Sequence, residues 1–315
     1  MSDELFQGKK GRVVEVWSME FIVPAEWYII PERVKKYRTA VVLGGTDSGK
    51  STFVRFLSSE LAKEGIPVGI VDLDVGQSDI GPPATFGLAL PRAPFRSYGD
   101  LPVESLFFLG TKTPWGNTLR GVAGAARLSA LSAARGTRCI VINTTGWIYG
   151  RSAKVYKQAK LEMLNPGLIV AFQRDRELDP VLLPYRHVTA TEVLILPVSP
   201  HIKVRSMEMR MRTRAEKFSR YLEGSRACTL RLSSLALAGA HRDELSCEDL
   251  LGRIVGLHDK ERNCLGIGVF LGTRGDGTIA VQAHGDHVSR LALLHVGRAR
   301  LEEENLLAMG ILRPQ

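Results

Sequence analysis

Between residues 38 and 224, the hydrophobic positions form short β-branched runs, separated by longer stretches with helical or irregular patterns. Alternating strand-like and helix-like segments favour a parallel sheet that helices cover on both faces. We therefore predict an α/β core over residues 38–224, with strands at Thr39–Leu43, Val68–Val71, Cys139–Ile142, Leu168–Phe172 and Glu192–Pro197.

The pattern changes on the N-terminal side of this core. Residues 1–37 contain two short apolar patches, Val13–Trp17 and Phe21–Ile30, and Pro24 interrupts the second patch. Short apolar runs bounded by proline are typical of edge strands. We expect a small β-like appendage here, and no separate domain.

The pattern also changes on the C-terminal side. Residues 225–315 contain short strand-like runs at Cys264–Gly272, Thr278–Ala283 and Ala292–Val296, with a Gly-Asp-Gly turn sequence at 275–277. Short strands joined by Gly-rich turns indicate an all-β unit. The sequence therefore predicts a small β-rich C-terminal domain.

The composition is typical of a folded protein with a basic surface. The chain has 315 residues, of which 44% are hydrophobic and 24% are charged, and this fits about two domains. Its 42 Lys and Arg exceed its 33 Asp and Glu, which gives a net charge of +9. This excess favours polyanionic partners such as nucleic acid or anionic lipid, and a role in solubility alone is the alternative.

The cysteines and the N-terminus bear on the cellular compartment. Cys139, Cys228, Cys247 and Cys264 are widely spaced and form no Cys-x-x-Cys pair, so they indicate neither a zinc site nor a disulfide framework. The polar segment Met1–Arg12 is unlike a signal peptide, and no apolar run approaches the ~20 residues that span a bilayer. We therefore expect a cytoplasmic protein without membrane contact.

The most specific motif follows the first predicted strand. It satisfies the pattern G-x-x-x-x-G-K-S/T, and Phe53, Phe56, Leu57 and Leu61 follow it at helical spacing. A glycine-rich loop that opens a helix can wrap its backbone amides around phosphates, with the lysine on the β- and γ-phosphates. The predicted nucleotide-binding residues are Gly44, Gly45, Thr46, Asp47, Ser48, Gly49, Lys50, Ser51 and Thr52.

A second polar element follows the strand at Val68–Val71. It begins with Asp72 and Asp74 and continues to Gln77. Ligands of open α/β sheets bind at the carboxyl ends of the strands, and the alternation of side chains along a strand predicts that both carboxylates point to the same side. One could hold a metal ion while the other accepts a proton, or both could cap the next turn.

Taken together, these motifs resemble the polynucleotide 5′-hydroxyl kinase family, which includes the kinase subunit of the mRNA 3′-end cleavage machinery. The resemblance depends on Thr46-Asp47 in the loop, on Asp-Val-Gly-Gln at 74–77, and on Asn-Thr-Thr-Gly-Trp at 143–147. It covers about residues 38–224, with a weaker similarity near Leu251–Gly272. It implies a P-loop NTPase core that uses ATP or GTP with Mg²⁺ and acts on the 5′-hydroxyl end of RNA or DNA.

The resemblance also implies catalytic roles. Lys50 would stabilise the transferred phosphoryl group. Ser51 or Thr52 would serve Mg²⁺ together with Asp74, and Asp72 is a further candidate metal ligand. Asp74 would also orient or deprotonate the attacking hydroxyl.

Three residues are candidates for substrate binding. The resemblance implies that Trp147 stacks on the terminal nucleotide, since an aromatic face can stack on any base. The alternative is that Trp147 packs in a hinge of the core. Gln77 and Arg151 are further candidate contacts to the substrate.

A basic segment at Lys203–Gly224 reads as one helix. It carries an apolar stripe with basic side chains on the adjacent face. The family has lid arginines in this region, so Arg210 and Arg214 are candidates to stabilise the transition state of phosphoryl transfer. A solvated basic face is the alternative. The stripe consists of Met207, Met211, Ala215, Phe218 and Leu222.

The sequence thus predicts a polynucleotide 5′-hydroxyl kinase with three segments: the appendage 1–37, the kinase domain 38–224 with the lid helix 203–224, and the C-terminal domain 225–315. Two other function classes stay open. One is a nucleotide-locked, non-catalytic subunit of an RNA-processing complex, and the other is a P-loop ATPase switch with paired aspartates. The sequence leaves the choice between ATP and GTP, the choice between RNA and DNA, and the protein partners open.

Overall fold

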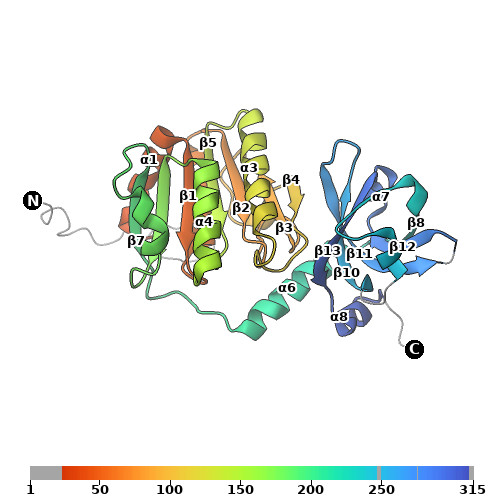
Figure 1. The fold of residues 1–315 in the computed structure, drawn as a ribbon. Coiled ribbons are helices and arrows are strands. Elements are labelled where there is room, and N and C mark those ends of the chain that lie inside the picture. The colour runs from red at the N-terminus through yellow and green to blue at the C-terminus, as the bar shows by residue number, and fades with distance from the viewer. Residues whose placement is uncertain (1–22, 247–249, 275, 312–315) are drawn as a thin grey trace, which may run out of the picture.

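The computed structural model describes residues 23–246, 250–274 and 276–311 (Figure 1). Five parallel strands form the centre of the core in the order β7-β6-β1-β5-β2, and β3 and β4 continue the sheet in antiparallel orientation. This confirms the predicted α/β class. The strands are β1 (Thr39–Gly44), β2 (Val68–Leu73), β3 (Thr85–Ala89), β4 (Val103–Phe108), β5 (Cys139–Thr144), β6 (Leu168–Gln173) and β7 (Glu192–Pro197).

Side chains alternate across β1, so the sheet has a hydrophobic core on each face. Ala40 and Val42 pack with α1 and α2 on one face, while Val41 and Leu43 pack with α3, α4 and α5 on the other. Two layers of helices therefore enclose the parallel strands. The helices of the core are α1 (Ile30–Tyr37), α2 (Lys50–Lys63), α3 (Thr118–Ala134), α4 (Arg151–Leu164) and α5 (Asp179–Leu182), with short 3₁₀ turns at Ala25–Ile29, Tyr98–Asp100 and Leu183–Tyr185.

The described part of the N-terminal appendage is helical, so the β-like prediction is wrong for residues 25–37. A 3₁₀ turn at Ala25–Ile29 leads into α1, and Pro31 lies in its first turn, where the missing amide is not needed. Trp27 packs edge-on against Phe53, with 4.9 Å between ring centroids. The patch Val13–Trp17 lies outside the described residues.

The C-terminal region is β-rich, as predicted, and it continues the same sheet. Leu106 of β4 pairs with Cys264 of β11, so the core sheet runs on into the C-terminal strands. The elements of this region are β8 (Arg226–Arg231), β9 (Ala236–Ala238), β10 (Arg253–His258), β11 (Cys264–Arg274), β12 (Thr278–Ala283), β13 (Leu293–Arg300), α7 (Gly285–Ser289) and α8 (Glu303–Ala308), with 3₁₀ turns at Leu232–Ser234 and Arg242–Ser246.

The basic helix predicted at 203–224 is α6, Met207–Leu222. It starts later than predicted because Ser206 caps it: the Ser206 hydroxyl accepts a hydrogen bond from the Met209 amide. Figure 1 shows α6 running from the core to the C-terminal strands.

The apolar stripe of α6 is buried only in its C-terminal half. Phe218 and Leu222 are 1% and 6% exposed and pack with Phe108 of β4 and Ile254 of β10, whereas Met211 is 55% exposed. The C-terminal half of α6 is therefore anchored in the hydrophobic contact between the core and the C-terminal strands.

We predict that Phe218→Ala destabilises the protein by ~3–5 kcal/mol, because it leaves a cavity where the two parts of the sheet meet. Met211→Ala on the same helix should change the free energy of unfolding by less than ~0.5 kcal/mol. Urea unfolding of both variants measures these values. Equal effects of the two changes would show that α6 is not anchored through Phe218.

Candidate active site

The motif Gly44–Thr52 forms the turn between β1 and α2, as the sequence predicts. Asp47 and Gly49 have φ angles of 50° and 91°, which let the backbone curl before the helix starts. A Cβ atom at Gly146, after β5, would lie 2.7 Å from the Thr46 backbone nitrogen, so glycine there allows the two loops to touch. The loop lines a cavity of about 340 Å³.

The side chain of Lys50 is folded back onto this loop. Its Nζ donates to the carbonyl of Gly45 at 2.5 Å and to the Ser48 hydroxyl at 3.3 Å. Burial lowers the pKa of Lys50 to about 8, and the negative charge of Asp74 acts in the opposite direction. An anion in the cavity would favour the charged form of this buried amine.

Asp72 and Asp74 lie in different surroundings, because Asp72 is buried near the end of β2 and Asp74 follows the strand. That both side chains point to the same side stays a prediction. Asp72 is 2% exposed, and its two oxygens accept hydrogen bonds from the backbone amides of Asp74, Asp79 and Ile80. Burial, together with the charges of Asp79 and Asp74, raises the pKa of Asp72 to about 7. The strand ends at Leu73, so Asp74 lies beyond the regular alternation.

Asp74 faces open space. It lines the cavity at the phosphate loop and also a second cavity of about 410 Å³. One of its oxygens accepts hydrogen bonds from the amides of Gly76 and Gln77 at 3.2 Å. This carboxylate therefore stands where the two cavities meet, with its orientation fixed by the following turn.

Asn143 connects the acidic element at the end of β2 with the phosphate loop. The register places it beside Asp72 on β2 and beside Val42 on β1. Its amide donates to Asp72 at 3.0 Å and to the Ser51 hydroxyl at 3.3 Å, while its buried carbonyl oxygen has no partner among the described residues. Asn143 thus positions Ser51 at the start of α2.

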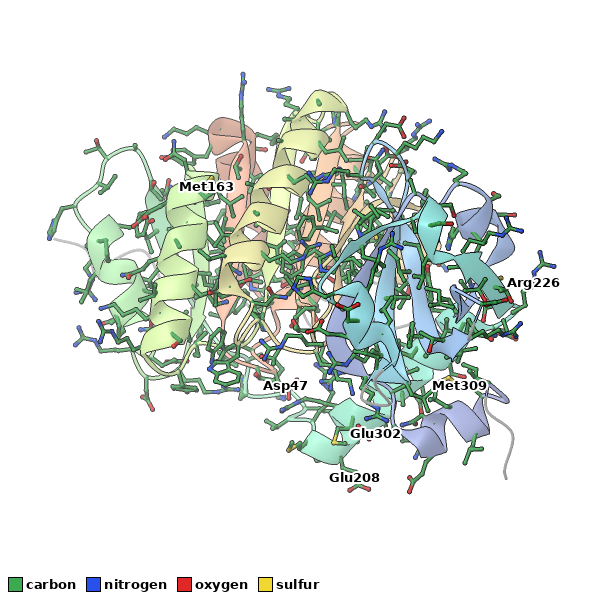
Figure 2. The ribbon with its side chains drawn as sticks, turned by 45° about the vertical axis from the view of Figure 1, so that its right-hand side comes forward. Asp47, Met163, Glu208, Arg226, Glu302 and Met309 are labelled. Carbon is green, nitrogen blue, oxygen red and sulfur yellow. The ribbon has the colours of Figure 1, made fainter. Side chains whose placement is uncertain are left out.

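A buried carboxylate in the phosphate loop holds the N-terminal end of α6. Asp47 accepts hydrogen bonds from Arg205 at 2.8 Å and from Arg210 at 3.0 Å. Figure 2 shows Asp47 at the lower edge of the core, with Glu208 of α6 further below. Burial alone would raise the pKa of Asp47, but the hydrogen bonds from Arg205 and Arg210 outweigh this effect and lower it.

The next turns of α6 bind the loop after β2. Arg214 donates to the carbonyl of Gly76 at 3.1 Å, and Lys217 forms an ion pair with Asp79 at 3.2 Å. Gln77 donates to the Arg210 carbonyl and accepts from Arg205. The predicted basic face of α6 therefore lies against the site and is not simply solvated.

The second cavity brings together two of the three predicted substrate-binding residues and the two candidate lid arginines. Gln77, Trp147, Arg210 and Arg214 line it. Trp147 is half-buried and its ring centroid lies 6.0 Å from that of Tyr156 of α4. Arg151 is exposed at the start of α4 and does not belong to the lining of this cavity.

Sequence reasoning missed several residues of this site. Arg205 and Lys217 were visible only as part of a basic segment, and their partners Asp47 and Asp79 lie far away in the chain. Lys157 of α4 is fully buried and donates to the Thr144 hydroxyl and the Thr145 carbonyl, which holds the loop before Trp147. A lysine inside an amphipathic helix gives no sequence signal for such a role.

Comparison with known proteins identifies the family. Residues 44–224 match the family described as mRNA cleavage and polyadenylation factor CLP1 P-loop. Because this match covers more than half of the chain, the protein belongs to that family of P-loop proteins. The structure agrees with this fold: a solved complex of Clp1p with Pcf11p superposes with a TM-score of 0.66 at 12% sequence identity, covering 87% of this chain and 79% of that one.

Several curated relatives are similar over the same region. A polyribonucleotide 5′-hydroxyl-kinase of Pyrococcus horikoshii is 37% identical over 220 residues, which are 69% of this chain and 59% of that protein. A polyribonucleotide 5′-hydroxyl-kinase of Thermococcus kodakarensis is 29% identical over an alignment of 346 positions, which covers 92% of this chain and 96% of that protein. The match to the Pyrococcus horikoshii protein spans less than two thirds of that protein's length.

The site geometry predicts different costs for the two aspartates. Asp72→Ala leaves buried amide donors without an acceptor and should lower the free energy of unfolding by ~3 kcal/mol or more. Asp74→Ala removes an acceptor at a more accessible turn and should cost ~1 kcal/mol. Denaturant unfolding at pH 7 tests this difference, which a larger loss for Asp74→Ala would contradict.

Proposed function

We propose that the protein transfers the γ-phosphate of ATP or GTP to the 5′-hydroxyl end of a polynucleotide. The position of Asp74 carries this proposal. It lines both the cavity formed by the phosphate loop and the cavity that contains Trp147, Arg210 and Arg214. A carboxylate between two cavities can act on a hydroxyl held in one and a phosphate held in the other.

In this proposal the nucleotide phosphates lie on the loop Gly44–Thr52. Lys50 exchanges the Gly45 carbonyl for phosphate oxygens, and Asp74 orients the attacking hydroxyl and accepts its proton. The residues around Lys50 fit Mg²⁺, because Ser51 and Asp74 offer the hard oxygen ligands that this ion prefers. Bound Mg²⁺ would neutralise charge on the β- and γ-phosphates.

The protein would supply few ligands to this ion. The described residues contain no group of three His, Cys, Asp or Glu side chains that could hold a metal. Mg²⁺ in kinases usually keeps several waters and binds substrate phosphates together with one or two carboxylates. Phosphates and water would therefore complete the coordination, and Asp72, whose oxygens accept four hydrogen bonds, would support the site from behind.

The second cavity is the proposed acceptor site. Trp147 at its rim would stack on the terminal base, and Gln77 would contact the same nucleotide. The relatives named polyribonucleotide 5′-hydroxyl-kinase favour RNA as the substrate. The net charge of +9 suits a polyanion, and the described helices include none long and apolar enough to span a bilayer. We propose a cytoplasmic location, because the widely spaced cysteines fit a reducing compartment.

The direct test is incubation with γ-labelled ATP, Mg²⁺ and a 5′-hydroxyl RNA oligonucleotide. We predict label on the oligonucleotide 5′ end with the wild-type protein and none with Lys50→Ala. Asp74→Asn should bind nucleotide but lose transfer, because it keeps the shape and removes the base or metal ligand. Matched DNA and GTP reactions establish the preferred substrates.

Two results would contradict the proposal. Transfer by Lys50→Ala at the wild-type rate would show that the loop is not the phosphate site. Tight nucleotide binding by the wild-type protein without any transfer to RNA or DNA would instead favour a nucleotide-locked, non-catalytic subunit.

A second prediction concerns the arginines of α6 that line the acceptor cavity. Arg210 and Arg214 should meet the phosphoryl group chiefly in the transition state, so the double change Arg210→Ala, Arg214→Ala should lower kcat by ~10³-fold. The nucleotide Kd should change little. Single-turnover rates and equilibrium binding measure the two quantities.

Arg212 provides the matched control on the same helix. Its side chain is 82% exposed and pairs with Glu216 one turn away. Arg212→Ala should leave kcat within about twofold of wild type, since exposed helix pairs contribute only ~0.3–0.5 kcal/mol. If the double variant behaves like Arg212→Ala, the arginines of α6 have no part in the transfer.

A further inference from the structure

A third cavity lies where the core meets the C-terminal strands, and it shares no lining residue with the two cavities of the proposed active site. Its volume is about 110 Å³. Its polar lining comes from both parts of the protein: α3, the end of β10, the turn after it, and the strands β11 and β13. These residues are Arg120, Arg127, His258, Arg262, Cys264 and His295.

The most informative residue of this junction cavity is His258. It is 6% exposed, and neither of its ring nitrogens has a hydrogen-bond partner among the described residues. The Arg262 backbone approaches the ring and raises its pKa, but the contact falls outside hydrogen-bond geometry. Buried polar atoms without a partner are rare, so an unpaired buried ring that lines a cavity is a candidate to bind a ligand there.

The charge of the junction cavity is one-sided. Arg120 donates twice to the carbonyl of Phe108, and Arg127 donates to the carbonyl of Arg262 and to Asn263. The described residues give neither arginine a carboxylate partner, and the lining contains neither Asp nor Glu. Arg120 also lies over the Phe107 ring, 4.9 Å from its centroid, so an aromatic face and neutral acceptors, and no carboxylate, surround these two positive charges.

The other titratable groups add no negative charge. Burial raises the pKa of Cys264 to about 12, so its thiol stays protonated at neutral pH. The described residues hold no group of three His, Cys, Asp or Glu side chains that could bind a metal ion. The donors of the lining thus suit an anion and not a cation.

The dimensions select a small anion. The cavity is well below the ~300 Å³ of a typical site for a larger organic ligand. The rings of His258 and His295 are neighbours in this lining, with centroids 6.2 Å apart. Arginine guanidinium groups are well matched to phosphate oxygens.

We propose that the junction cavity binds one phosphate-class oxyanion, held by Arg120, Arg127, His258 and His295. The ion would be free phosphate or a phosphodiester group of a nucleic acid strand. Because the arginines belong to α3 and the histidines to β10 and β13, the bound ion ties the core to the C-terminal strands. This inference does not depend on the proposed phosphoryl transfer.

The titration of the two histidines provides a specific readout. Burial and the charge of Arg120 lower the pKa of both rings to about 4, with Arg127 acting in the same direction on His258 and Asp259 acting against it. His258 also lowers the pKa of His295. An anion in contact with the rings favours their charged form and should raise each pKa by ~1–3 pH units.

The experiment follows the histidine ring signals of the 315-residue protein by NMR. The range of about pH 3.5–8 covers both the lowered pKa of about 4 and the ordinary histidine pKa of about 6.5. The titration is done alone, with inorganic phosphate, and with a 5′-hydroxyl trinucleotide; His258→Gln and His295→Gln assign the signals. Inorganic phosphate also binds phosphate loops, but such binding does not titrate these two rings. We expect phosphate, the trinucleotide, or both to raise the pKa of His258 and His295.

Variants separate anion binding from a general change in the fold. Arg127→Gln removes an arginine of the cavity that is partly open to solvent. In this variant, the anion concentration needed to raise the histidine pKa values should be at least ~tenfold higher than in the wild type. Arg231→Gln changes an exposed arginine of β8 outside the lining and should leave the effect unchanged.

The outcomes are distinct. If inorganic phosphate raises the two histidine pKa values, a free oxyanion is enough to occupy the cavity. If only the trinucleotide raises them, the ligand is a phosphodiester group. Histidine pKa values that neither compound changes would overturn the proposal, as would a response of undiminished affinity in Arg127→Gln.

Discussion

The buried carboxylate of Asp47 joins two parts of the chain that lie far apart in the sequence. Its side chain is 3% exposed, and it receives Arg205 and Arg210 from the segment that begins α6. A buried carboxylate that loses its cationic partners is strongly unfavourable. The start of α6 is therefore held against the phosphate loop, and the positions of Arg214 and Lys217 over the loop after β2 follow from it.

This arrangement connects the site to the C-terminal strands. The far end of α6 is fixed by Phe218 and Leu222, which pack with residues of β4 and β10. One helix thus spans from the phosphate loop to the junction of the sheet. A change in the seating of α6 would alter the acceptor cavity, since Arg210 and Arg214 line it.

The sequence predicted the parts of the site that depend on local chemistry. The loop Gly44–Thr52 and the five parallel strands are where the pattern placed them, because a strand, a glycine-rich turn and an amphipathic helix are local features. The alternation of β2 ends with the strand at Leu73, and no local pattern indicated that Asp72 accepts backbone amides of the following loop.

The remaining features depend on contacts between distant segments. The short apolar patch broken by Pro24 suggested an edge strand, but the segment is helical, and Trp27 packs against Phe53 and Phe172 of the core. Asn143 appeared as part of a motif, yet its role requires the register of β5 between β1 and β2. The junction cavity brings together α3, β10 and β13, which no local pattern indicates.

Hydrogen exchange of the α6 amides in Asp47→Asn tests the central role of this carboxylate most directly. Near the start of the helix the Met209 and Arg210 amides bond to Ser206, whereas Phe218 and Leu222 are buried at the other end. If Asp47 holds the helix, exchange should accelerate at Met209–Arg214 and stay slow at Phe218–Leu222. Unchanged exchange at Met209–Arg214, or equal acceleration along the whole helix, would contradict the account.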